Sequence, residues 1–135
     1  MVVTLAGGCL CGAVRYEAAG PPEYAGLCHC RDCQRATGTG HAPYMGFAHD
    51  HVTIRGETRA FAVIGGSGAR SLRHFCPTCG THVFGVRDPD DGTCTIYAGT
   101  LDDPELFAPR EAIFVRSRRS WDHGALPLPE FPALP

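Results

Sequence analysis

The sequence has 135 residues, which is enough for one domain rather than two. Its 44% hydrophobic and 19% charged residues are typical of a globular protein, and no run of about 18 apolar residues predicts a membrane span. The formal net charge of −2 argues against a nucleic-acid partner.

Short strands separated by Gly and Pro turns dominate the predicted secondary structure. Alternation of apolar and polar residues is the main signal, and one short helix is expected over 32–37. The expected strands are 14–17, 41–47, 52–55, 59–63, 71–75, 81–86, 94–98 and 112–115. Pro43, near the start of the second strand, favours a position at a sheet edge for it. Many short strands in one small chain predict a mainly β, single-domain fold.

The two ends of the sequence have different compositions. The first residues lack a basic start and a long apolar segment, so we expect no signal peptide and a cytoplasmic location. From Leu126 onwards four of the ten residues are prolines. We therefore expect a folded domain over 1–125 and a Pro-rich tail over 126–135 that runs extended over the surface.

Eight cysteines are the unusual feature of the composition. Seven of them form three clusters, C-x-C at 9–11, C-x-C-x-x-C at 28–33 and C-x-x-C at 76–79, and Cys94 stands alone. Thiols two or three residues apart can converge on one metal ion, and they suit a framework of long-range disulfides poorly. A reducing compartment would also keep them reduced. The spacing therefore favours zinc over disulfides.

The first and third clusters together supply four thiolates, Cys9, Cys11, Cys76 and Cys79. In both clusters a glycine directly follows the second cysteine, which suits a tight turn with positive φ around a thiolate. Four thiolates close a tetrahedral zinc site, and such a structural ion contributes about 10 kcal/mol to folding. The alternative is two unrelated pairs of redox-active or buried thiols.

The second cluster has three thiols, Cys28, Cys30 and Cys33, and no fourth cysteine nearby. If zinc binds here, water, a substrate or a distant residue takes the fourth position, and an open position distinguishes catalytic from structural zinc. The alternative is that the cluster binds no stable metal. The residues that would close the site are His41, His74, His82 and Cys94.

Several residues near the clusters have simpler interpretations. Cys94 shares a strand face with Ile96 and is expected to be a core thiol. His29 lies between two ligands, so its ring should point away from the metal. Arg31 and Arg35 are four apart on the expected helix, where they face one side of the site or form a solvated pair.

These motifs, in this order, resemble the glutathione-dependent formaldehyde-activating enzyme family, which includes centromere protein V-like proteins. The resemblance runs from about residue 5 to residue 122. The late Trp121 is also similar to a family landmark. Relatives often carry His where this chain has Ala112. The matching segments are 8–16, the Cys28-His29-Cys30 run with Cys33, 73–81 and 99–104.

The resemblance implies a β-tent fold with two zinc ions per chain. It assigns the structural ion to Cys9, Cys11, Cys76 and Cys79 and a catalytic ion to Cys28, Cys30 and Cys33. It also implies condensation of formaldehyde with glutathione to S-hydroxymethylglutathione, or the reverse carbon–sulfur cleavage, and hence small thiol and aldehyde partners. The candidate contacts to the glutathione carboxylates are Arg31, Arg35 and Arg73. The alternative functions are a non-catalytic, zinc-scaffolded binding module and a carrier of the thiol adduct.

Overall fold

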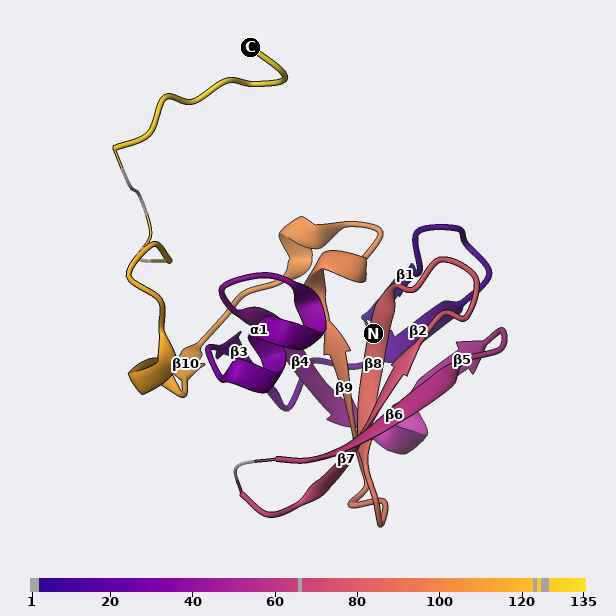
Figure 1. Ribbon diagram of the computed structural model, residues 1–135. Helices are drawn as coiled ribbons and strands as arrows, with labels where there is room; N and C mark the ends of the chain where they lie inside the picture. The colour runs from indigo at the N-terminus through magenta and orange to yellow at the C-terminus, as the bar shows by residue number, and fades with distance from the viewer. Residues whose placement is uncertain (1–2, 66, 123, 125–126) are drawn as a thin grey trace.

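The computed structural model describes residues 3–65, 67–122, 124 and 127–135. These residues form two β-sheets and one α-helix, α1 (Arg31–Thr37), in a single small domain (Figure 1). Short 3₁₀ helices follow some of the strands. They are η1 (His49–His51), η2 (Ala98–Thr100), η3 (Pro104–Leu106) and η4 (Val115–Ser117).

The smaller sheet has three antiparallel strands in the order β1-β2-β5. The larger sheet has seven strands in the order β10-β3-β4-β9-β8-β7-β6, and all its pairs are antiparallel except β10 with β3. The strand bounds are β1 Thr4–Gly8, β2 Arg15–Ala19, β3 Tyr24–Cys28, β4 Ala42–Ala48, β5 Val52–Arg55, β6 Arg59–Ile64, β7 Arg70–Phe75, β8 His82–Arg87, β9 Thr93–Tyr97 and β10 Glu111–Ile113.

Two clusters of buried side chains lie on opposite faces of the larger sheet. Met45 on β4 pairs with Ile96 on β9, and both belong to the main core together with residues of the smaller sheet. The next pair, Tyr44 and Tyr97, belongs to a smaller cluster around Cys28 and Cys33. Successive residues of a strand point to opposite faces, which is why neighbouring positions serve different clusters.

Helix α1 is short and is held at both ends by local contacts. At its start the Cys30 thiol accepts a hydrogen bond from the backbone N–H of Cys33. At its end Gly38 adopts the left-handed conformation, with φ of 70°, and donates its N–H to the Gln34 carbonyl. The helix is therefore capped at both ends, and its start is fixed directly at Cys30 and Cys33.

The predicted fold class is confirmed, because the protein is a mainly β single domain with cysteine clusters suited to zinc. Strands appear at each expected position, with ends that differ by two residues at most, and the helix begins at Arg31 rather than at Asp32. The strand expected over 112–115 ends at Ile113, because Val115 already lies in η4. Strands β1 and β3 were not expected from the sequence.

The prediction of an edge position for the strand that contains Pro43 is wrong. β4 lies between β3 and β9, well inside the larger sheet. Pro43 pairs with Leu27 of β3, whereas pairing with β9 begins only at Tyr44. The proline is thus accommodated at the end of a central strand, beyond its contact with one of the two neighbours.

Among the described residues, no helix has the length and apolar character needed to cross a membrane. Residues 127–135, within the expected tail, form no helix or strand and are exposed.

Candidate metal centres

The first candidate centre brings together four thiols from two loops. Cys9 and Cys11 lie between β1 and β2, and Cys76 and Cys79 lie between β7 and β8. Their sulfur atoms all lie within 4.8 Å of one another. The Sγ atoms of Cys9 and Cys11 are 3.6 Å apart, and those of Cys11 and Cys76 are 3.7 Å apart. Zn–S bonds of about 2.3 Å in a tetrahedron give sulfur separations of about 3.8 Å, so this donor set fits zinc.

The backbone around these thiols is shaped as the glycine positions predict. Gly12 and Gly80 have positive φ values of 82° and 76°, which glycine adopts without steric cost. The backbone N–H of Val14 donates to the Cys9 sulfur at 3.2 Å. The Cys79 pKa is lowered to about 5, mainly by a hydrogen bond with the Thr81 hydroxyl. These contacts favour the thiolate form that zinc requires.

The second candidate centre lies at the start of α1. Cys28 ends β3, Cys30 precedes the helix and Cys33 lies in its first turn, and the three sulfur atoms are within 4.8 Å of one another. Arg73 of β7 brings Nη2 to 3.8 Å from the Cys33 sulfur. The Cys33 pKa is lowered to about 6, first by the hydrogen bond from Cys28 and then by bonds from Cys30 and Arg73. A thiolate at Cys33 is therefore favoured at neutral pH, and three converging thiols fit a zinc ion with an open position.

The four residues considered as a fourth ligand lie elsewhere. Cys94 is fully buried in the main core, as predicted. His74 stacks on Phe84, with ring centroids 4.4 Å apart, and His82 packs on Tyr97 at 4.2 Å. His41 bonds with Asp122 instead. Within the part of the chain that the structure describes, no fourth His, Cys, Asp or Glu joins this cluster.

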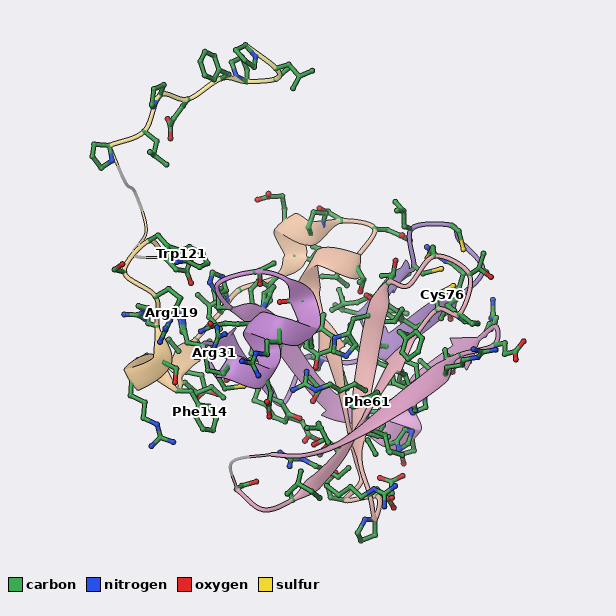
Figure 2. All side chains as sticks on the ribbon, in the orientation of Figure 1. Arg31, Phe61, Cys76, Phe114, Arg119 and Trp121 are labelled. Carbon is green, nitrogen blue, oxygen red and sulfur yellow. The ribbon has the colours of Figure 1, made fainter. Side chains whose placement is uncertain are left out.

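The two thiol clusters are well separated in the molecule. In Figure 2, Cys76 lies on one side of the sheets, and Arg31, on the helix that carries the second cluster, lies on the other. Cys9 and Cys76 belong to the main core, whereas Cys28 and Cys33 belong to the smaller cluster. Each centre is thus surrounded by its own set of packed side chains.

A cavity of about 650 Å³ opens beside the second cluster, and all three of its thiols line it. Two of the three arginines considered for glutathione, Arg31 and Arg73, are in the cavity wall, whereas Arg35 is not. Arg35 lies in the last turn of α1, away from the three thiols in and before the first turn. Arg87 and Arg116 also line the cavity.

Tyrosines and one glutamate of the cavity wall were not found from the sequence. Tyr44 donates a hydrogen bond to Oε1 of Glu111 at 2.8 Å. Burial raises the pKa values of Tyr44 and Tyr97, which keeps both hydroxyls protonated. Gly26 makes room for the Tyr44–Glu111 contact, because a Cβ there would lie 2.6 Å from the Tyr44 hydroxyl. Only the alternation along β4 and β9 could have indicated that the two tyrosines share a face.

Comparisons with known proteins find similarity to one described family. The sequence model of a family described as "Glutathione-dependent formaldehyde-activating enzyme" matches residues 4–117. A curated protein of Halomonas elongata, named "Putative glutathione-dependent formaldehyde-activating enzyme", is 33% identical over 90 residues. That match covers 63% of this chain and 57% of the relative, so the chain spans little more than half the relative's length.

A solved structure supports the fold. The crystal structure of a Rhodobacter sphaeroides protein is similar with a TM-score of 0.52 and 23% sequence identity. The similarity covers 72% of this chain and 87% of the other. At this identity the similarity indicates a shared fold alone.

Proposed function

This chain belongs to the glutathione-dependent formaldehyde-activating enzyme family, whose model matches residues 4–117, and on that premise we propose that it is a zinc-dependent enzyme of the carbon–sulfur lyase type. It joins glutathione, or another small thiol, to formaldehyde, or it cleaves the S-hydroxymethyl adduct. The observation that carries the proposal is the group of three converging thiols in the wall of a 650 Å³ cavity. A cavity of this size suits a small peptide thiol.

We propose two zinc ions per chain, one held by Cys9, Cys11, Cys76 and Cys79 and one by Cys28, Cys30 and Cys33. At the second site, a bound zinc ion would act as a Lewis acid and lower the pKa of a thiol bound to it. All eight cysteines are free thiols in the structure. This supports a reducing compartment, and we propose the cytoplasm.

Arginines of the cavity wall supply the charge that glutathione needs. Arg73 is half-buried beside Cys33, and one of its guanidinium nitrogens, Nη1, is buried without a hydrogen-bond partner among the described residues. Arg31 and Arg116 line the same cavity. A guanidinium binds a carboxylate with two parallel hydrogen bonds, so these side chains can orient the ends of the peptide. Since Arg35 lies outside the cavity wall, we leave it out of the binding site.

The reaction also requires one proton to move. The thiol loses its S–H proton, the sulfur forms a bond to the aldehyde carbon, and the former carbonyl oxygen takes up a proton to become a hydroxyl. Tyr44 and Glu111, 2.8 Å apart in the cavity wall, form a path along which a proton can be held and passed. We assign them this acid–base role, since a positioned proton donor or acceptor accelerates such steps by about 10²- to 10⁴-fold.

The experiment measures binding and exchange in the zinc-loaded full chain. Titration with glutathione should give saturable binding at millimolar concentrations or below. Added ¹³C-formaldehyde should then exchange with the adduct faster than in buffer, as measured by NMR. Arg73→Met should weaken glutathione binding about tenfold or more, as expected for one lost charge-assisted contact. Arg59→Met, on the exposed edge strand β6, is the matched control and should change neither quantity.

Two results would contradict the proposal in different ways. Absence of glutathione binding at millimolar concentration would leave the thiol substrate without support. Binding of the adduct without faster exchange would instead identify a carrier or binding module.

A further inference from the structure

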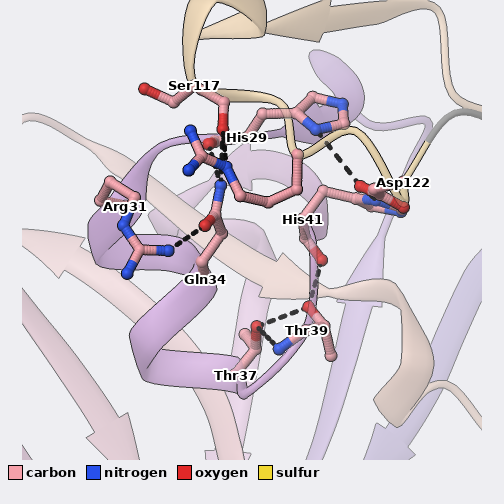
Figure 3. A network of polar contacts seen from close by, with 9 residues as sticks. His29, Arg31, Gln34, Thr37, Thr39, His41, Ser117 and Asp122 are labelled. Atoms are coloured by element: carbon pink, nitrogen blue, oxygen red, sulfur yellow. Dashed lines mark hydrogen bonds and ion pairs between the residues drawn. The ribbon is translucent and has the colours of Figure 1, made fainter.

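A third group of side chains with metal-ligand atoms lies beside the Cys28–Cys33 segment, outside the cavity wall. It consists of His29, His41 and Asp122, whose ligand atoms all lie within 4.8 Å of one another (Figure 3). They come from three separate segments, the link between β3 and α1, the residue before β4 and the chain after η4. Cys28 and Cys30 line the cavity, whereas His29 between them does not. The group is therefore distinct from both thiol clusters.

One distance within this group fits a coordination sphere, and the other is at present that of a hydrogen bond. Oδ2 of Asp122 lies 2.7 Å from Nδ1 of His41 and 3.4 Å from Nδ1 of His29. The two imidazole rings have centroids 5.1 Å apart. Metal–ligand bonds of about 2.0 to 2.2 Å give donor separations of about 3 to 3.5 Å, depending on geometry. Small rotations of the rings would therefore place all three donors around one ion.

The residues around the Asp122 carboxylate restrict its position. His29 is 2% exposed and the Asp122 side chain 19%. Gly40 is tightly packed against the carboxylate, because a Cβ at this position would lie 2.6 Å from Oδ2 of Asp122. The amide of buried Gln34 donates to the His29 carbonyl at 2.8 Å and to the Ser117 carbonyl at 3.0 Å. The segment that carries Asp122 is thus held against the base of α1.

We propose that His29, His41 and Asp122 bind a divalent first-row transition-metal ion. Two imidazoles and one carboxylate are a ligand set that suits Zn²⁺, Fe²⁺ and Co²⁺ rather than the oxygen-seeking Ca²⁺ or Mg²⁺. Three protein donors leave at least one position for water. The bound ion links the C-terminal segment to the loop between two thiols of the second centre, so it stabilises the placement of those thiols. The competing explanation is a His41–Asp122 hydrogen bond that holds this segment without metal.

Cobalt binding to the full chain distinguishes the two explanations. Protein with zinc in both thiol centres is titrated with Co²⁺, and metal per chain is measured by elemental analysis after gel filtration. We expect a third ion per chain, with a visible Co²⁺ spectrum that lacks thiolate-to-cobalt charge transfer because the donors are N and O. His41→Ala and Asp122→Asn should each weaken this third binding at least tenfold and retain two zinc ions.

The matched control is His49→Ala. His49 forms an exposed pair with Asp90 at the same 2.7 Å spacing, and its loss should leave the third ion in place. Two outcomes would overturn the proposal, a wild-type protein that binds only two ions up to millimolar Co²⁺, or a third ion that binds both variants undiminished. Circular dichroism checks that each variant is folded. If neither variant folds, the wild-type metal count and cobalt spectrum decide alone.

Discussion

Serine substitution of single cysteines should reveal how differently the two thiol centres contribute to stability. Cys9 and Cys76 are buried in the main core, in loops that join β1 to β2 and β7 to β8. Their centre therefore connects the smaller sheet to the larger one, and Cys11 and Cys76 are 65 positions apart in the sequence. Cys30 is only partly buried, against the smaller cluster beside the cavity. Loss of one thiol should consequently have unequal effects at the two places.

The magnitudes follow from the contacts. A structural zinc contributes about 10 kcal/mol to folding, whereas a chain of 135 residues is stable by about 7 to 20 kcal/mol in total. Cys9→Ser should therefore remove most or all of the stability. At Cys30 the thiol also accepts the N–H of Cys33 as a helix cap. Serine is a favoured capping residue, so Cys30→Ser retains that contact and should cost about 1 to 2 kcal/mol at most.

Thermal unfolding followed by circular dichroism, together with zinc content, measures both effects. Cys9→Ser should lose its cooperative transition. Cys30→Ser should retain a transition within about 10 °C of the wild type, since 1 kcal/mol shifts Tm by about 4 °C in a domain of this size, and it should contain one zinc fewer. Cys79→Ser is expected to behave like Cys9→Ser. Equal destabilisation by Cys9→Ser and Cys30→Ser would refute the assignment of separate structural and cavity-facing centres.

Three further substitutions test other contacts. Gly46→Ala should lower Tm by several degrees in a thermal melt, because its Cβ would lie 1.8 Å from the Tyr24 ring and overpacking costs about 1 to 3 kcal/mol; an unchanged Tm would contradict this. Burial lowers the His82 pKa to about 4. The contribution of the neutral His82 ring to the free energy of unfolding is therefore fully present above pH about 6.5. It declines as the pH falls towards 4, by at most about 3 kcal/mol. His82→Phe should therefore show a smaller loss of urea stability between pH about 7 and 5 than the wild type, and equal losses would refute the argument. Tyr44→Phe should slow adduct exchange at least tenfold with glutathione affinity retained, and an unchanged rate would remove Tyr44 from the proton path to Glu111.

The sequence predicted local features of the fold and of the site better than distant pairings. The cysteine clusters were recognisable because their spacing is short and metal geometry restricts it. The core role of Cys94 was also predictable, since strand alternation places it with Ile96. The edge position expected for Pro43 was wrong because the second neighbour of its strand, β9, comes from a distant part of the chain. A local pattern carries no information about such partners.

Local patterns carry no information about distant contacts, which also explains why some residues of the cavity and the group of His29, His41 and Asp122 were not predicted. Glu111 reaches Tyr44 only because β10 pairs in parallel with β3. The departure from the family pattern at Ala112 did not indicate that the preceding residue, Glu111, lines the cavity. His29 was expected to point away from the thiols, and the structure shows Asp122 beside it, from a segment far along the chain. Long-range pairing, rather than motif spacing, determines these contacts.

The register of β4 and β9 places core residues and cavity residues on opposite faces of the same two strands. Met45 and Ile96 are buried in the main core, and the adjacent pair on the same strands, Tyr44 and Tyr97, lines the cavity. A one-residue shift in register would exchange these two faces, so the apolar pairs that stabilise the sheet also fix the cavity tyrosines. Substitutions at positions 44 and 97 can therefore alter the cavity at little cost to the main core. Substitutions at 45 and 96 should disturb both, because the same strands support both faces.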